Sequence, residues 1–198
     1  MLDSIHRLNN KVFFHRNDGL SFRRRRKKMD FDKIKRIALL ILELALAIGL
    51  GYLTVISFGQ QVECSNESME PTYDMGDTLL INTIAYKLSE PESGDIIAFK
   101  PRSNVNASYS IKRVIAVPGD TIYIEKGRIY INDEIYKDSV SSDTIENAGI
   151  AASPISLGDD QYFVLGDNRN ESEDSRYESI GLVSGEDIFG KVWAKYPF

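Results

Sequence analysis

One serine and one lysine of this chain are placed where they could act as a nucleophile and its base. Ser68 lies in the stretch SNESMEPT (65–72), where Pro71 fixes its own φ angle and biases Glu70 away from the helical region. A rigid turn of this kind can hold a hydroxyl in one pose, although ordinary Ser/Pro turns share the pattern. A serine hydroxyl becomes an effective nucleophile when an adjacent group accepts its proton.

Lysine is the best candidate for that base, because the two histidines of the chain, His6 and His15, both lie near its beginning. Lys112 lies in SIKRVIAV (110–117), which alternates like a strand and gives the lysine apolar neighbours. Burial lowers the pKa of a lysine, and a neutral lysine can act as a general base. The alternative is a lysine at a sheet edge whose amine reaches the solvent.

A polar loop, GDNRNESEDSR (166–176), follows the apolar run QYFVL. Ion pairs could brace this loop, and the residues able to form them are Asp167, Arg169, Asp174 and Arg176. A solvated loop has the same composition. Its carboxylates lack the D-x-D-x-D-G spacing of a calcium loop, so we expect no metal site. Cys64 is the single cysteine, which excludes an intramolecular disulfide and a cysteine-based metal site.

The chain after residue 58 is typical of a β-rich domain, which we expect over residues 59–198. Short alternating or apolar runs recur there between turn-forming residues. They are residues 77–86, 94–100, 110–117, 121–125, 128–133, 161–167 and 191–196. Glu125-Lys126-Gly127 predicts a hairpin turn between two of these strands. Residues 137–160 are polar and rich in turn formers, which predicts an extended loop or insertion.

Residues 37–58 are apolar over a length that crosses a hydrocarbon core of about 30 Å as a helix. Glu43 is the one charge in this segment, and its cost is outweighed by the apolar residues around it. A cleaved signal peptide is the alternative, but its apolar core is about 7–15 residues long and precedes an A-x-A-like site. The following SFGQQVEC offers no such site, so we predict an uncleaved transmembrane anchor.

Charge divides the chain at this anchor. Residues 1–36 carry 12 Lys/Arg and four acids, whereas residues 59–198 carry 12 Lys/Arg and 24 acids. The positive-inside rule predicts that the basic segment lies in the cytoplasm, where it contacts lipid headgroups, and that the domain lies outside. Nothing else in the chain is typical of a nucleic-acid-binding module, so nucleic acid is not expected as a partner.

Four motifs resemble those of the bacterial type I signal peptidases, and they occur in the same order. The serine motif S-M-x-P-T is similar to residues 68–72, and the G-D-I/V-V motif is similar to residues 94–97. The lysine motif K-R-V/A-x-x-x-P-G-D matches residues 112–120, and G-D-N-R-x-x-S-x-D-S-R matches residues 166–176. One motif alone would be weak, whereas four in order after an anchor are specific.

This resemblance implies an antiparallel β catalytic domain of the signal-peptidase type that needs no cofactor. Ser68 would attack the scissile carbonyl, and Lys112 would take its proton on the way to an acyl-enzyme. Ser172 would hydrogen-bond to the lysine amine and orient it. The supporting residues of the same motifs would be Arg113, Asp167, Asp174 and Arg176. Met69 would contact the substrate.

The residue two positions before the nucleophile departs from the family pattern. The resemblance implies an oxyanion held by the backbone N–H of Ser68 and one further donor. Many relatives have a serine or a glycine two positions before the nucleophile, whereas this chain has Asn66. Our hypothesis is that the side-chain amide of Asn66 is the second donor.

The implied activity is removal of signal peptides from exported preproteins by a monomeric membrane enzyme close to the secretion translocase. Small apolar pockets would accept small side chains at two substrate positions.

One alternative is a self-cleaving Ser–Lys peptidase related to the SOS repressors, which would need a DNA-binding domain and a cytosolic location. The other is an inactive, anchored binding module that keeps the fold, with which the departure at Asn66 is compatible. Cleavage activity separates these alternatives.

Overall fold

The described part of the chain begins just before a long apolar helix. The structure is a computed structural model that describes residues 30–102, 108–137, 140 and 144–196. Most of the basic segment predicted over residues 1–36 therefore lies outside the described residues. Contacts within the chain form two units, residues 1–44 and residues 45–198. The boundary lies inside the helix, so the last turns of the helix belong with the folded domain.

Helix α1 (Phe31–Phe58) begins before the predicted membrane segment and ends at the predicted residue. Within the described residues, it is the one helix whose length and apolar composition would allow it to cross a membrane. Its last turn is fixed to the domain by two hydrogen bonds. The backbone N–H of Thr83 donates to the Ser57 carbonyl over 3.0 Å, and Trp193 Nε1 donates to the Phe58 carbonyl over 3.3 Å.

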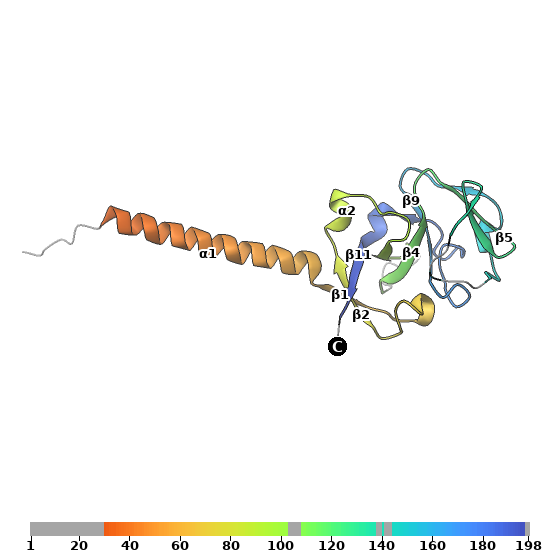
Figure 1. Cartoon of the computed structure of the whole chain (residues 1–198), viewed down its shortest axis with the longest axis horizontal. Coiled ribbons are helices and arrows are strands. Elements are labelled where there is room, and N and C mark those ends of the chain that lie inside the picture. Colours follow the sequence, from red (N-terminus) through yellow and green to blue (C-terminus); the bar gives the residue numbers. More distant parts are fainter. Residues whose placement is uncertain (1–29, 103–107, 138–139, 141–143, 197–198) are drawn as a thin grey trace, which may run out of the picture. The chain divides into compact units, whose positions relative to one another are not determined.

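The domain is built mainly on a seven-stranded antiparallel sheet (Figure 1). Its strands are β1 (Gln60–Glu63), β2 (Thr78–Asn82), β3 (Ile96–Phe99), β4 (Ser110–Ala116), β9 (Gln161–Leu165), β10 (Val183–Ser184) and β11 (Ile188–Lys195). Their spatial order is β1-β2-β11-β3-β4-β9-β10, so the C-terminal strand lies between β2 and β3. The mostly β, antiparallel class predicted from the sequence is confirmed.

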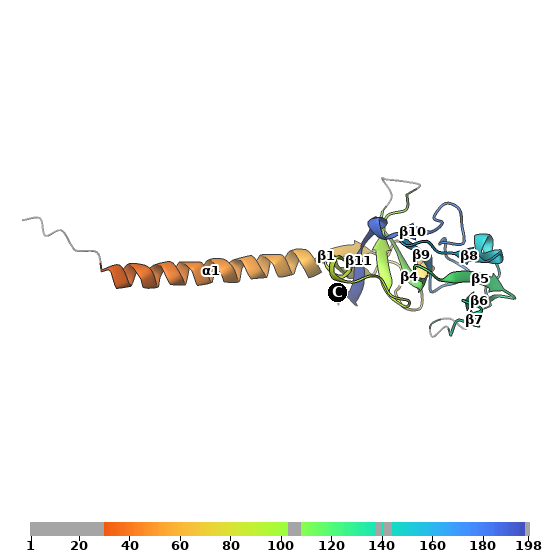
Figure 2. The same ribbon diagram turned by 90° about the horizontal axis from the view of Figure 1, so that it is seen from above.

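Residues between β4 and β9 form a second, smaller sheet (Figure 2). Its strands are β5 (Thr121–Glu125), β6 (Arg128–Ile131), β7 (Glu134–Ile135) and β8 (Ile155–Ser156), in the order β7-β6-β5-β8. The predicted hairpin turn joins β5 to β6, and Lys126 and Gly127 both adopt positive φ angles there. Glycine tolerates this conformation without a steric penalty, which explains its place in the turn.

Two segments differ from the sequence prediction. The strand expected over residues 77–86 ends at Asn82, because the Asn82 side-chain oxygen accepts the N–H groups of Ile84 and Ala85, each over 3.0 Å. The chain therefore turns into the short helix α2 (Ala85–Leu88). The loop expected over residues 137–160 contains β8 and a 3₁₀ turn, η2 (Gly149–Ala152), in its described part. Three of its apolar residues are buried in the core, and they are Ile145, Ala151 and Leu157.

The core of the large sheet positions two segments that matter for chemistry. One cluster of buried residues joins Met69 to Val62 and Cys64, and it also contains Ile111 of β4. A second cluster contains Val114 of the same strand. Strand β4 lies inside the sheet between β3 and β9, and five of its seven residues are buried, Lys112 among them. Lys112 therefore lies on a largely buried strand.

Candidate active site

The turn that carries Ser68 is a single 3₁₀ turn, η1 (Glu67–Met69), which follows an extended residue, Asn66. The Asn66 side-chain oxygen caps this turn by accepting the backbone N–H of Ser68 over 3.2 Å. Asparagine is a preferred capping residue because its short side chain reaches the free N–H groups of the first turn. Ser68 is buried, so its hydroxyl is held inside the domain.

Lys112 lies in the middle of β4, opposite Ile97 of β3, and its side chain is buried. Its amine nitrogen, Nζ, donates to Ser68 Oγ over 2.6 Å. Burial lowers the pKa of the Lys112 amine, and the negative charge of Asp174 acts in the opposite direction. The structure therefore brings together the two residues that the sequence singled out, with the lysine in an environment that favours its neutral form.

The loop after β9 holds the nucleophile turn from the other side. The backbone N–H of Asn168 donates to the Ser68 carbonyl over 3.0 Å. The Asn168 side-chain amide donates to the Glu67 carbonyl over 3.3 Å. Gly166 allows this close approach, because a Cβ added there would lie 2.4 Å from the Ser68 carbonyl oxygen. The chain at Ser68 is thus positioned by backbone contacts as well as by its own turn.

Asp167 connects three segments that carry predicted site residues. Arg113, which follows the lysine on β4, donates to both Asp167 carboxylate oxygens over 2.8 and 2.6 Å. Thr72, which ends the serine motif, donates its hydroxyl to the same carboxylate over 2.5 Å. The Arg113 guanidinium also donates to the Gly94 carbonyl over 2.8 Å. Asp167 therefore fixes the serine segment relative to the lysine strand through a buried carboxylate.

Asp174 and Arg176 form a second, fully buried ion pair in the same loop. Arg176 donates to Asp174 through Nε over 2.8 Å and through a terminal nitrogen over 2.9 Å. It also donates to three backbone carbonyls, those of Asn147, Arg169 and Ser172. The backbone N–H of Gly166 donates to Asp174 over 3.1 Å. Of the four residues predicted to form ion pairs in this loop, Asp174 and Arg176 pair with each other, whereas Asp167 pairs with Arg113 of β4.

Ser172 does not make the hydrogen bond predicted for it. Within the described residues its hydroxyl is buried and has no hydrogen-bond partner. It lies against Gly166 instead, since a Cβ added to that glycine would be 2.2 Å from Ser172 Oγ. The Lys112 amine donates to Ser68 instead. Ser172 is nevertheless next to the segment that holds the nucleophile.

Two further predictions need correction in detail. The hypothesis for Asn66 required its side-chain nitrogen to face the oxyanion position, but its oxygen faces the Ser68 N–H. The backbone N–H is a donor, and only the amide oxygen can accept from it. Met69 was expected to contact the substrate. It is completely buried beneath the nucleophile turn, and it does not line the cleft described next.

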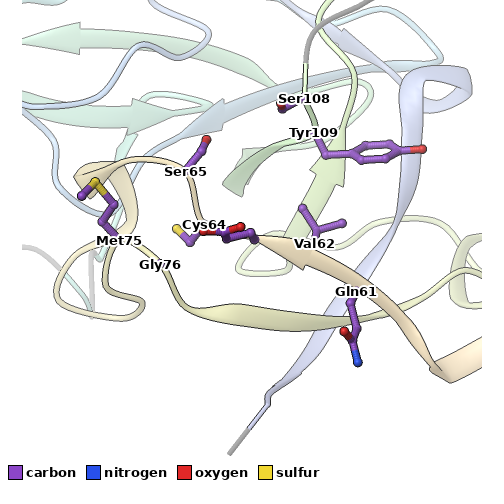
Figure 3. A pocket seen from close by; sticks show the side chains of 9 residues that line it. Gln61, Val62, Cys64, Ser65, Met75, Gly76, Ser108 and Tyr109 are labelled. Atoms are coloured by element: carbon purple, nitrogen blue, oxygen red, sulfur yellow. The ribbon is translucent and has the colours of Figure 1, made fainter. Parts of the chain in front are cut away.

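A cleft of about 530 Å³ lies beside the nucleophile turn (Figure 3). Strand β1 and the residues after it form one side, and Ser108 and Tyr109, just before β4, contribute from another. Its lining residues are Gln61, Val62, Glu63, Cys64, Ser65, Met75, Gly76, Ser108 and Tyr109. Cys64 connects the cleft to the site, because its thiol donates to the Asn66 carbonyl over 3.5 Å.

The sequence analysis did not identify this cleft, because β1 was not predicted. QQVE is short and has a single apolar residue, so its period-2 signal is weak. In the described sheet β1 is an outermost strand that pairs with β2 alone, which leaves one edge of its backbone available. The same described residues contain no group of three His, Cys, Asp or Glu residues that could hold a metal ion.

Comparison with known proteins gives one consistent family. The family described as signal peptidase, peptidase S26, matches residues 34–196. The chain is 34% identical to probable signal peptidase I-2 of Synechocystis sp. over 157 residues, which cover 77% of this chain and 68% of the relative. It is 32% identical to signal peptidase I of Leptolyngbya laminosa over 161 residues, covering 77% and 75%. It is 31% identical to signal peptidase IB of Staphylococcus aureus (strain COL) over 180 residues, covering 80% and 91%.

Proposed function

The chain belongs to the type I signal peptidases of the peptidase S26 family, which are serine peptidases, and we propose that it removes signal peptides from exported preproteins with a Ser–Lys dyad. In this proposal Ser68 is the nucleophile and Lys112 is the general base. The observation that carries it is the 2.6 Å contact between Lys112 Nζ and Ser68 Oγ, both buried. That distance lies within the reach required of a nucleophile and its base.

The reaction follows from the chemistry of these two groups. Neutral Lys112 takes the hydroxyl proton as Ser68 Oγ forms a bond to the scissile carbonyl carbon. The ammonium then gives that proton to the leaving amine nitrogen, the peptide C–N bond breaks, and an acyl-enzyme ester remains. Water, deprotonated by the same lysine, hydrolyses the ester and releases the signal peptide. The lowered pKa of Lys112 supplies the neutral amine that the first step requires.

Neighbouring groups support the charges that develop during these steps. The backbone N–H of Ser68 is the donor to the oxyanion. Ser172 is the partner of the lysine after proton transfer. Its hydroxyl is buried without a partner in the described structure, and an ammonium offers more donors than a neutral amine.

The cleft is the proposed binding site for the signal peptide. An extended peptide can add to the available edge of β1 through main-chain hydrogen bonds, in the manner of β-strand addition. Alternate side chains of such a peptide would point toward the buried residues Val62 and Cys64, whereas Glu63 is exposed. The space against a well-packed core favours small residues there, as the A-x-A pattern of signal peptides requires.

Helix α1 is the proposed single membrane anchor. With the basic segment in the cytoplasm, the domain faces outward, where translocated signal peptides emerge. The hydrogen bonds from Thr83 and Trp193 to the last turn of α1 would attach the domain to the outer end of this anchor. A monomer near the secretion translocase, acting on peptides that leave the membrane, fits this placement.

Cleavage of a preprotein with an A-x-A site by the full chain in detergent tests this function. We expect wild type to cut after that site, and Ser68→Ala and Lys112→Ala to lose detectable cleavage while keeping the wild-type melting temperature within a few degrees. Thr54→Ala in α1, whose hydroxyl contacts only its own helix backbone, serves as the matched control. Failure of folded wild type to cut several preproteins would instead favour an inactive binding homologue.

A further inference from the structure

The side-chain oxygen of Asn66 contacts both reactive groups of Ser68. It accepts the Ser68 hydroxyl over 2.6 Å and the Ser68 backbone N–H over 3.2 Å. The first group is the proposed nucleophile, and the second is the proposed oxyanion donor. A substrate carbonyl oxygen that enters the site needs the same N–H, at a donor distance of about 2.7–3.1 Å. Asn66 therefore presents an amide oxygen where the scissile amide oxygen has to bind.

The hydrogen bonds also place the serine proton away from the base. A serine hydroxyl has one proton to donate. In the described structure it is donated to Asn66, while Lys112 Nζ donates to Ser68 Oγ. General-base catalysis requires the reverse polarity, with the hydroxyl proton directed at the lone pair of the amine. Ser68 and Lys112 are thus within hydrogen-bonding distance, but their protons are not yet arranged for transfer from the hydroxyl to the amine.

We infer that Asn66 keeps the resting enzyme inactive by occupying the oxyanion position, and that the scissile carbonyl of the signal peptide activates the dyad by displacing it. This inference rests on the proposed function. When the peptide oxygen takes the Ser68 N–H, the Asn66 oxygen leaves both contacts, and the hydroxyl proton turns to neutral Lys112. Occupation of the oxyanion position by the carbonyl and activation of the nucleophile are then one event.

The surroundings of Asn66 allow its side chain to move while its backbone stays in place. Its carbonyl accepts from the Cys64 thiol, and the next residues are held by Asn168. The Asn66 residue itself is exposed, so its amide can rotate toward solvent without opening the core.

The affinity of a catalytically inactive variant for a signal peptide separates blocking of the oxyanion position by Asn66 from donation of a hydrogen bond to the oxyanion by Asn66. The parent is full-length Lys112→Ala, which keeps Ser68 and Asn66, and the ligand is a signal peptide with an A-x-A site. Adding Asn66→Ala removes the competing oxygen, and we expect about 5-fold tighter binding, equivalent to the net value of one hydrogen bond, about 1 kcal/mol. If Asn66 were only an oxyanion donor, the same change would weaken binding or leave it unchanged, and that result would overturn the inference.

Three controls identify the oxygen as the cause. Asn66→Asp keeps an acceptor on Ser68, so it should not tighten binding. Equal tightening by Asp and Ala would show that the acceptor oxygen is not the cause and would refute the inference. Ser89→Ala, at the exposed end of α2 and outside the cleft, should leave the affinity unchanged. A peptide whose scissile carbonyl is reduced to a methylene should gain nothing from Asn66→Ala. Wild-type cleavage, run in parallel, reports separately on the proposed function.

Discussion

Replacing Asp174 with alanine tests how the buried polar loop supports the site. Asp174 is completely buried, and its carboxylate accepts four hydrogen bonds. Three come from Arg176 and one from the backbone of Gly166. Alanine would leave the Arg176 guanidinium, itself 2% exposed, without a counter-charge in the protein interior. Water cannot replace the lost carboxylate unless the loop opens.

The expected cost is large on the scale of domain stability. Breaking a buried ion pair by removing one partner costs about 3–5 kcal/mol, against total stabilities of about 5–15 kcal/mol. For a domain of this size, the melting temperature should fall by roughly 10 °C. The assay is thermal unfolding of the full chain in detergent, followed by Trp193 fluorescence. Asp187→Ala is the matched control, because its partner Arg102 is exposed, and such pairs contribute about 0–1 kcal/mol.

A double variant separates charge from packing. Asp174→Leu combined with Arg176→Met removes both charges and keeps the volume, so it should recover most of the lost stability. A loss for Asp174→Ala as small as that of Asp187→Ala would refute the reasoning, since it would mean that the guanidinium tolerates burial alone. Equal losses for the double variant and for Asp174→Ala would point to the backbone contacts of the loop rather than to its charge balance.

The remaining predictions concern the lysine and the glycine beside the nucleophile. Because burial lowers the pKa of Lys112, kcat/KM should rise with pH through an inflection below the ordinary lysine value of 10.5. Asp174→Asn should move this inflection to a still lower pH, since the charge of Asp174 raises the pKa of Lys112. An upward shift would contradict the assignment of Lys112 as the titrating base. Lys112→Met should increase the free energy of unfolding at pH 7, because the buried lysine has a lowered pKa in the folded state and binds a proton more readily in the unfolded state. This gain should disappear as the pH approaches 10.5, where the unfolded lysine also loses its proton. Chemical denaturation across this pH range measures the difference. Gly166→Ala should reduce kcat about 100-fold, because the added Cβ would lie 2.2 Å from Ser172 Oγ. Gly158→Ala is the control, because a Cβ added there would meet only a flexible glutamine side chain. This control should cleave preprotein at the wild-type rate.

Much of the fold could be predicted because its signals are local. Residues 121–125 alternate between the two faces of a strand, residues 110–117 are largely apolar, and the turn at Lys126-Gly127 depends on backbone angles that few residues adopt. The missed elements lack such signals. Strand β1 has one buried residue, and β8 exists only because Ile155 and Ser156 pair with β5, so neither can be recognised without its partner.

In the candidate site, too, the features that local sequence signals report could be predicted, and those that depend on distant neighbours could not. The identity of Ser68 and Lys112 followed from residue types, from the absence of a nearby histidine and from the resemblance of four motifs to those of the signal peptidases, none of which needs geometry. The orientation of individual side-chain atoms could not be predicted from the sequence, because neighbours that are distant in sequence decide a side-chain rotamer. The opposite orientation of Asn66 and the unpartnered hydroxyl of Ser172 are both of this kind.

A buried lysine is costly to the fold, and the arrangement around β4 explains how the domain holds it. Burial disfavours the ammonium, which is what the proposed chemistry needs, but it gives Lys112 no ion pair with which to fix its own position. The two buried ion pairs fix its surroundings instead. Asp167 holds the neighbouring Arg113 and the serine segment together, and Asp174 holds the loop that contacts Ser68. Both carboxylates belong to one stretch of eight residues, 167–174, so a single loop sets the distance between Ser68 and Lys112, which are 44 residues apart in sequence.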